Sequence, residues 1–240
     1  MTKIHRRIES YVSSWFKQLD ESFNVKREPR ENKPFVTISR ETGAYGTTLA
    51  AMLVEYLAKH ERRQDVSWAA FDKELISKVI EEYKFPEKYN EYLAESTMPV
   101  IQDIMEELLG VHPPKETLVR NMSEAIFRFA QVGYVILIGR GANIITARLP
   151  KGVHVRLVGS LEKRVAHMQG YLNVSEKEAR DYVIKEDRNR QDYIKKYFHQ
   201  DIDDVSLYDI VINSDTVPLE DVVRIIAEMV LKGKGKPQQV

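Results

Sequence analysis

The 240-residue sequence contains no cysteine. This absence excludes a disulfide scaffold, a zinc site built from thiolates and a cysteine nucleophile. The sequence also has no net charge, because 36 lysines and arginines balance 36 aspartates and glutamates. A basic field over the whole surface is therefore not expected, and we predict no nucleic-acid partner.

Long hydrophobic runs are absent as well. No apolar stretch approaches the roughly 18 residues that cross a bilayer, and residues 1–20 lack the apolar centre of a signal peptide. We therefore expect a cytoplasmic protein with no membrane partner. The apolar residues of segment 3–22 recur at helical spacing and predict an amphipathic helix. Such a helix docks on its own domain or on a second subunit, so a homodimer through this helix is one expectation.

What the sequence has is a regular alternation of strand-like and helix-like segments. Five β-rich runs precede segments with helical spacing, at 35–39, 66–71, 134–139, 153–159 and 208–213. This alternation predicts an α/β fold, with parallel strands joined by right-handed crossovers. Ser175 and Glu178 form a capping box that predicts the start of a long charged helix. In such folds ligands bind at the carboxyl ends of the strands, so the loops that follow the strands are the candidate site.

The loop after the first strand-like run has the rhythm of a phosphate-binding loop but lacks its lysine. Aligned with the spacing G-x-x-x-x-G-K-[ST], Gly46 and Thr48 match, whereas Glu41 replaces the first glycine and Thr47 replaces the lysine. In that motif backbone N–H groups hold phosphate oxygens, the lysine adds a charge, and the hydroxyl binds magnesium. The motif alone leaves two interpretations open, a nucleotide site with altered parts and an ordinary strand–turn–helix connection.

Six sequence blocks in the same order resemble the cytidylate kinase-like proteins, within the P-loop nucleoside monophosphate kinases. The first block, "SRETGAYG", is similar to the S-R-E-[YF]-G-[SA]-G-G loop of that family. The others are "FDKELI", "VILIGRGANIITARLP", "HVRLVGSLEKRV", "KEDRNRQDYIKKYF" and "YDIVINSDTVPLEDVV". The resemblance runs from residue 35 to about residue 231. It implies a three-layer P-loop kinase fold, with a five-stranded parallel sheet of order 2-3-1-4-5, a helical acceptor insertion and a lid.

The same resemblance implies how the chain is divided. An N-terminal amphipathic helix and linker would occupy residues 1–33, the P-loop domain residues 34–233, and a flexible tail residues 234–240. Within the domain, residues 83–132 would form the helical acceptor-side insertion, and residues 172–198 the lid region.

By resemblance, the protein is an ATP- and Mg²⁺-dependent phosphotransferase. It would move the γ-phosphoryl group of ATP to a nucleoside monophosphate of the CMP type or to a related small phosphate acceptor. The residues implied to bind ATP are Arg40, Gly43, Ala44, Tyr45, Gly46, Thr47 and Thr48, and Thr48 would also face the metal. The residues implied to bind the acceptor are Asp72, Lys73 and Arg140. The residues implied to be catalytic are Arg140, Arg188 and Arg190.

Several of these residues also have purely structural interpretations. Arg140 leaves a buried strand where a guanidinium can grip phosphate with two hydrogen bonds, but it could instead pair with a helix end. Asp72 could hold a sugar hydroxyl, orient the attacking phosphate or position magnesium through water, and it could equally cap the helix that follows. Arg164 is expected in a surface ion pair.

Arg188 and Arg190 are two residues apart, about 200° around a helix, so they cannot share one face. Lid arginines in this superfamily close over the transferring phosphoryl group, and we expect Arg188 ahead of Arg190 in that role. The alternative is a solvated charged helix. The charge missing at Thr47 would come from Arg40, from Lys73 or from a lid arginine.

Two other functions remain open. The missing lysine is compatible with a nucleotide-binding regulatory protein that has no kinase activity. Cytidylate kinases carry an aspartate where this sequence has Gly141. That departure is compatible with a kinase for a non-nucleotide small molecule.

Overall fold

The computed structural model describes residues 33–61, 63, 66–77 and 114–232. The predicted N-terminal helix over residues 3–22 and the tail over residues 234–240 therefore lie outside the described residues. So does most of the predicted insertion, of which the last helix is described. No helix in the described ranges combines the length and the apolar composition that a membrane span requires.

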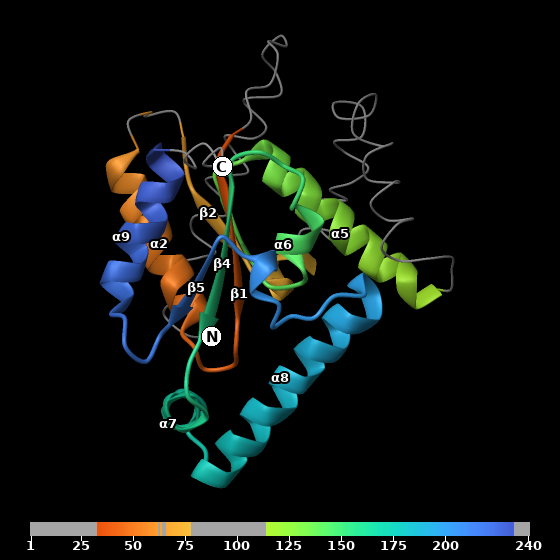
Figure 1. The fold of residues 1–240 in the computed structure, drawn as a ribbon, viewed down its shortest axis with the longest axis vertical. Coiled ribbons are helices and arrows are strands. Elements are labelled where there is room, and N and C mark those ends of the chain that lie inside the picture. The colour runs from red at the N-terminus through yellow and green to blue at the C-terminus, as the bar shows by residue number, and fades with distance from the viewer. Residues whose placement is uncertain (1–32, 62, 64–65, 78–113, 233–240) are drawn as a thin grey trace.

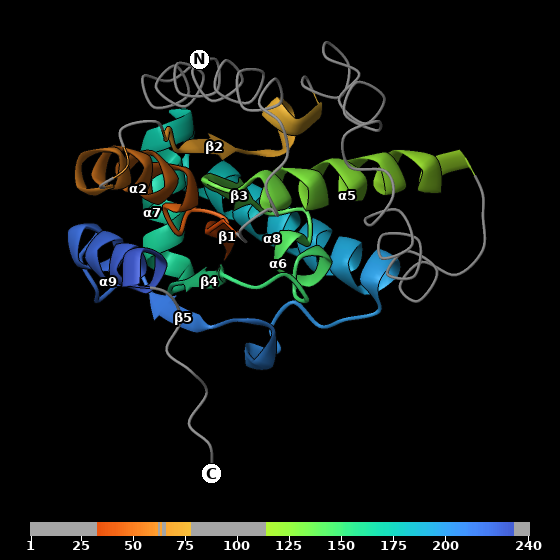
Figure 2. The same cartoon turned by 90° about the horizontal axis from the view of Figure 1, so that it is seen from above.

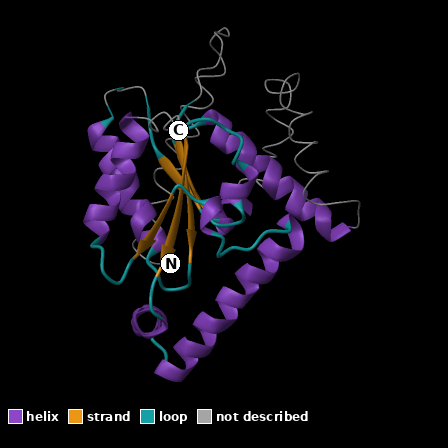
Figure 3. Ribbon diagram, viewed as in Figure 1, coloured by secondary structure: helices purple, strands orange, loops and turns teal. Residues whose placement is uncertain are grey.

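The centre of the fold is a five-stranded parallel sheet (Figures 1 and 3). The strands are β1 (Phe35–Arg40), β2 (Ala69–Phe71), β3 (Val135–Ile138), β4 (Gly152–Val158) and β5 (Ile210–Asn213). Their order across the sheet is β2-β3-β1-β4-β5. This is the order that the resemblance implied, and the prediction is confirmed.

The strand ends differ from the predicted ends for local reasons. β3 is shorter than the predicted 134–139 because Tyr134 and Gly139, which flank it, both have left-handed φ angles of 54° and 78°. A strand requires extended backbone, so pairing stops at both residues. β2 begins at Ala69 rather than at residue 66, because its pairing with β3 spans three residues only. These differences leave the order of elements unchanged.

Helices cover both faces of the sheet. α2 (Gly46–His60) and α9 (Leu219–Lys232) lie side by side on one face, and α5 (Pro114–Val132) and α6 (Ala142–Ile145) lie on the other (Figure 2). The remaining helices are α7 (Leu161–Leu172), α8 (Glu176–Phe198) and the short 3₁₀ helix Val205–Leu207. Because both faces are covered, β3 is apolar and buried along its length, and β1 is buried from Phe35 to Ser39.

The helices α7 and α8 form a hairpin beyond the carboxyl ends of the strands (Figure 1). The capping box predicted at its turn is confirmed: the Ser175 hydroxyl accepts from the N–H of Glu178 at 3.3 Å, and the Glu178 carboxylate accepts from the N–H of Ser175 at 2.9 Å. The hairpin has a small core separate from the main one, made of Val165, Met168, Ala179 and Val183. Only the far end of α8 enters the main core, through Ile194 and Phe198.

The separate hairpin core generates a prediction about local stability. Val183 is fully buried there, whereas the next residue, Ile184, is 50% exposed. We expect Val183→Ala to lower the free energy of opening of the hairpin by about 2 kcal/mol, because two methyl groups leave a packed site. Hydrogen exchange should then accelerate in α7 and α8 and stay unchanged in β1 and β3. Ile184→Ala is the matched control and should leave exchange unchanged; equal effects of the two substitutions would contradict the separate core.

Candidate active site

The loop between β1 and α2 turns sharply at the carboxyl end of the central strand. Gly43 and Tyr45 have left-handed φ angles of 86° and 61°, and the N–H of Ala44 donates to the carbonyl of Glu41 at 3.2 Å. A Cβ atom on Gly43 would lie 2.6 Å from the carbonyl oxygen of Arg164, so this position requires glycine. No side chain caps the start of α2. The free N–H groups and dipole of a helix start favour an anion at this place.

A carboxylate fastens this loop to α8. One oxygen of Asp187 accepts hydrogen bonds from the N–H of Thr42 at 2.7 Å and from the Thr42 hydroxyl at 2.6 Å. The guanidinium of Arg190 also contacts the Thr42 hydroxyl and lies 3.3 Å from the same carboxylate. Asp187 therefore holds the loop and directs Arg190 at the same time.

Arg164 joins α7 to the same group. Its guanidinium donates to Asp187 at 2.6 Å and to the carbonyl of Thr42 at 3.1 Å, and it lies 3.3 Å from Glu41. The residue is only 8% exposed, so the surface ion pair expected from the sequence is wrong: the pair is buried. We call Thr42, Arg164, Asp187 and Arg190 the loop junction.

A second unusual backbone segment ends β3. Gly139, Arg140 and Gly141 have left-handed φ angles of 78°, 57° and 71° in succession. Arg140 is not a glycine, so its conformation carries a steric cost that the surrounding packing must hold in place. A Cβ atom on Gly141 would lie 2.7 Å from the ring of Phe198. The segment therefore directs the Arg140 side chain from a rigid position at the end of the strand.

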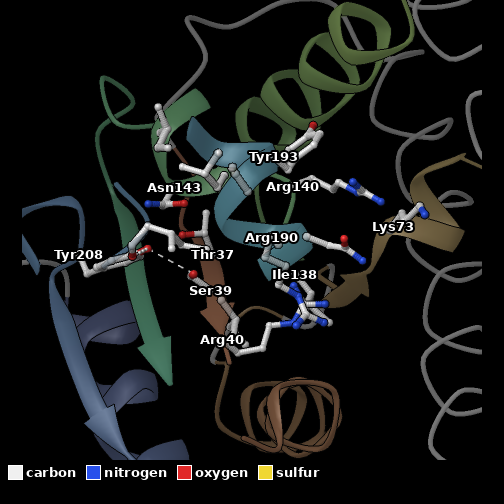
Figure 4. A pocket seen from close by; sticks show the side chains of 18 of the residues that line it. Thr37, Ser39, Arg40, Lys73, Ile138, Arg140, Asn143, Arg190, Tyr193 and Tyr208 are labelled. Carbon is white, nitrogen blue, oxygen red and sulfur yellow. Dashed lines mark hydrogen bonds between the residues drawn. The ribbon is translucent and has the colours of Figure 1, made fainter. Parts of the chain in front are cut away.

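A cavity of about 280 Å³ lies beside these segments, lined by residues of β1, β3, α6 and α8. Four cationic side chains line it together with one carboxylate, that of Glu186; the cations are Arg40, Lys73, Arg140 and Arg190. Figure 4 shows the four cations on the same side of the cavity. An excess of fixed positive charge in a concave site binds an anionic ligand.

Arg40 is the most enclosed of the four cations. Its side chain passes Gly46, where an added Cβ atom would lie 2.9 Å from Cγ of Arg40, and reaches Gly139, where the Nη1 atom would be 2.1 Å from an added Cβ. Burial, and then the charge of Arg190, lower the pKa of Arg40 to about 10, against the smaller opposing effect of Asp72. Arg40 remains charged at pH 7, but in a site that disfavours its charge.

Arg140 is oriented by an aromatic ring. Its guanidinium lies 5.0 Å from the centre of the Tyr193 ring, in a cation–π contact. Burial raises the pKa of the Tyr193 phenol, so the ring stays neutral at physiological pH. The contact holds the guanidinium at the wall of the cavity, which both residues line.

The structure brings together only part of the residues predicted from the sequence. Arg40, Lys73, Arg140 and Arg190 meet at the cavity. Arg188 is exposed and does not line the cavity, whereas Arg190, expected second to it, does.

The other predicted residues lie beside the cavity. Gly43, Ala44, Tyr45, Gly46, Thr47 and Thr48 form the adjacent loop and the first turn of α2. Tyr45 packs on the ring of His167, with the ring centres 3.8 Å apart. The carboxylate of Asp72 accepts from the N–H of Leu75 at 3.0 Å, so its capping role is present. The same carboxylate acts electrostatically on Arg40.

Five residues that were not predicted from the sequence either join the loop junction or line the cavity: Asp187, Tyr193, Ser39, Asn143 and Tyr208. Asp187 and Tyr193 stand in the block "KEDRNRQDYIKKYF". Asp187 lies three residues before Arg190, and Tyr193 lies four residues after Asn189. These helical spacings were the available sign that the residues share a face with the candidate site. Tyr208 carried no signal, because its partner Ser39 lies 169 residues away along the chain.

The residues present fit a phosphate-bearing ligand better than a metal held by protein alone. No group of three or more potential metal ligands occurs in the described part of the chain. Thr48 offers one hydroxyl in the first turn of α2. Mg²⁺ commonly takes one or two protein oxygens and completes its shell with phosphate oxygens and water, so Thr48 could hold the ion only together with a phosphate ligand.

Of three similar solved structures, the first supports the fold. The structure of an uncharacterized protein from Eubacterium ventriosum ATCC 27560 has a TM-score of 0.62 at 20% identity, over 82% of this chain and 98% of that chain. Shikimate kinases from Bacteroides thetaiotaomicron and Acinetobacter baumannii, the latter in complex with shikimate, have TM-scores of 0.45 and 0.42 at 17% and 13% identity. These alignments cover 82% and 86% of this chain and 98% and 97% of theirs. No curated protein matches the chain.

The model of the cytidylate kinase-like family matches residues 35–216. This range begins at the first residue of β1 and ends after β5, so it includes the whole sheet, the loop junction and the cavity. The sequence resemblance is thereby confirmed, and the chain belongs to the cytidylate kinase-like family.

Proposed function

We propose that the protein is a phosphotransferase that moves the γ-phosphoryl group of ATP to a small acceptor bearing its own phosphate, such as a nucleoside monophosphate. The observation that carries this proposal is the group of four cations around one cavity, beside an uncapped helix start at the carboxyl end of β1. A charged transferring group needs such cations in its transition state.

Phosphoryl transfer requires mainly that the reactants be aligned and that their negative charge be neutralised. The acceptor's phosphate is itself an oxyanion nucleophile, so no strong general base is needed, and catalysis rests on alignment and charge neutralisation. Bound Mg²⁺ would neutralise the nucleotide phosphates. The N–H groups at the start of α2 would bind the donor phosphates, and the Thr48 hydroxyl would face the metal. Arg140, fixed by Tyr193, would hold the acceptor's phosphate.

Arg40 and Arg190 would together supply the positive charge that the missing lysine would have supplied. Arg40 reaches the space between Gly46 and Gly139, which lies between the loop and the end of β3. Arg190 is held at the cavity by the loop junction. The lowered pKa of Arg40 supports this role, because a cation held among cations gains most from a bound anion.

The first prediction separates the two lid arginines. We expect Arg190→Ala to lower kcat/KM by about a hundredfold or more, because it removes a charge aimed at the reacting phosphoryl group. Arg188→Ala is the matched control on the same helix, and its effect should stay within about threefold. ADP release, measured with ATP, Mg²⁺ and a panel of phosphate acceptors, is the assay. Binding of ATP without ADP release on any acceptor would instead support a nucleotide-binding regulatory protein.

The second prediction concerns the charge of Arg40. Because folding lowers its pKa, the charged form destabilises the folded protein at every pH below about 10, and this cost fades between about pH 10 and the ordinary arginine range. We therefore expect Arg40→Met to raise the melting temperature of the free protein at pH 8, and to abolish the stabilisation by inorganic phosphate and by ATP that the wild type shows.

The control for this experiment is Arg148→Met, which changes an exposed arginine away from the cavity. It should leave both melting temperature and ligand stabilisation near the wild-type values. A lower melting temperature for Arg40→Met, with phosphate stabilisation retained, would show that Arg40 is a structural cation.

A second candidate function is a kinase for a non-nucleotide phosphate acceptor. In cytidylate kinases an aspartate at the position of Gly141 takes part in acceptor recognition, and here the ring of Phe198 fills the space of such a side chain. The acceptor site of this chain therefore differs from the nucleotide pattern at one defined contact.

The third prediction tests the contact between Gly141 and Phe198. Gly141→Ala should lower the free energy of unfolding by about 2 kcal/mol or more, because it adds a left-handed backbone cost to a steric overlap. Gly170→Ala is the control, since nothing lies within 4 Å of a Cβ atom there and alanine favours the helix. Urea denaturation measures both. A neutral Gly141→Ala would mean that the cavity can accept the family's aspartate.

A further inference from the structure

The cavity has a second end that differs chemically from the cationic one. Its polar residues are Thr37 and Ser39 of β1, Asn143 of α6 and Tyr208, just before β5. Figure 4 shows these side chains across the cavity from Arg40, Arg140, Arg190 and Lys73. We call Thr37, Ser39, Asn143 and Tyr208 the neutral end.

Each hydroxyl of the neutral end already has a protein partner that fixes its direction. The Ser39 hydroxyl accepts from Arg156 at 3.0 Å. The Tyr208 O–H donates to the carbonyl of Ile202 at 2.8 Å, so the 3.3 Å hydrogen bond between Ser39 and Tyr208 uses the Ser39 O–H. Ser39 is then left with a lone pair that can accept. Burial raises the pKa of Tyr208, so the phenol stays protonated. An oriented hydroxyl whose proton is already used suits a ligand group that donates.

Asn143 adds an acceptor. Its amide nitrogen donates to the carbonyl of Leu207 at 3.4 Å, so the amide oxygen points the other way, towards the cavity (Figure 4). The residue is only 6% exposed, which makes it a fixed part of the wall. The neutral end therefore offers acceptors at Asn143 and Ser39.

The neutral end is not a second anion site. The nearest cation, Arg156, contacts the carboxylate of Asp203 and donates to Ser39. Its guanidinium lies 5.7 Å from the centre of the Tyr208 ring. Its charge is therefore neutralised and its position is fixed, so it adds little attraction for a free anion.

The cavity also offers no pair of open aromatic faces for a nucleobase. Its only lining aromatic residues in the described chain are Tyr193 and Tyr208. Arg140 covers a face of the Tyr193 ring and Arg156 covers a face of the Tyr208 ring. Hydroxyl groups match the neutral end better than a flat base does, because each hydroxyl can donate to the acceptors there.

We propose that the neutral end is a subsite for the hydroxyl-bearing part of a sugar phosphate or polyol phosphate acceptor, whose phosphate lies among Arg40, Arg140 and Arg190. The proposal rests on the proposed function for the cationic end, and it names the class of acceptor. The two ends lie in one cavity of about 280 Å³, a size suited to a small phosphorylated sugar.

The test compares three probes by isothermal titration calorimetry. Inorganic phosphate reports the cationic end, ribose 5-phosphate reports both ends, and CMP adds a base to the same sugar phosphate. We expect ribose 5-phosphate to bind at least about tenfold more tightly than inorganic phosphate, because two or more hydrogen bonds are added. We expect CMP to bind no more tightly than ribose 5-phosphate.

Two variants test which residues give ribose 5-phosphate its higher affinity. Tyr208→Phe keeps the ring beside Arg156 and removes only the phenol oxygen that orients the Ser39 hydroxyl. Asn143→Ala removes the amide oxygen. Each should reduce the tenfold advantage of ribose 5-phosphate by at least about threefold while leaving the affinity for inorganic phosphate unchanged. Tyr171→Phe, on an exposed tyrosine of α7, is the matched control and should change neither affinity. Tyr208→Phe keeps the test intact if Asn143→Ala fails to fold.

The outcomes separate this proposal from the proposed function. Equal affinities for inorganic phosphate and ribose 5-phosphate, or an advantage that survives Tyr208→Phe, would overturn the subsite even if ADP is released with some acceptor. CMP binding tenfold more tightly than ribose 5-phosphate would overturn the sugar-phosphate class in favour of a nucleotide. An advantage that Tyr208→Phe reduces, without ADP release on any acceptor, would support the subsite and contradict the phosphotransferase.

Discussion

The carboxylate of Asp187 joins three parts of the protein that the sheet alone does not hold together. It accepts from the N–H and the hydroxyl of Thr42, and it pairs with Arg164 of α7 and Arg190 of α8. The α7–α8 hairpin packs around its own small core, so its position over the strand ends depends on this junction and on the far end of α8. With these partners the partly buried anion is compensated, whereas removing the carboxylate would take a counter-ion from both arginines. The place of Arg190 beside the cavity follows from this one carboxylate.

The order of elements could be predicted from the sequence because strand and helix periodicities are local properties. The sheet order came from the resemblance, and both hold in the structure. The ends of β3 could not be predicted, since Tyr134 adopts a left-handed φ that nothing in its neighbours requires. The neutral end of the cavity was also missed. Ser39, Asn143 and Tyr208 are ordinary polar residues in the sequence, and only the crossing of β1, α6 and the approach to β5 brings them to one wall.

Helical spacing alone does not determine whether Arg188 or Arg190 faces the cavity. The sequence established that the two side chains point in different directions, but not which direction faces the site. Val183 lies seven residues before Arg190, and Ile184 lies four before Arg188, so either apolar residue could have been the buried one. The structure buries Val183 with Ala179 against α7 and leaves Ile184 exposed. That packing turns Arg190 towards Thr42. It depends on α7, and the sequence of α8 alone does not show which of its faces packs on α7.

Arg40 belongs to the last position of β1, which pairs with Leu157 of β4, rather than to the helix that follows the loop. If it supplies the charge that lysine supplies elsewhere, the cation has moved from the loop into the framework of the sheet. The loop sequence is then free to drift during evolution as long as the strand keeps its arginine. Genome surveys that recognise these enzymes by the Gly-Lys pair would overlook such proteins, and a search pattern anchored on the strand's final residue would recover them.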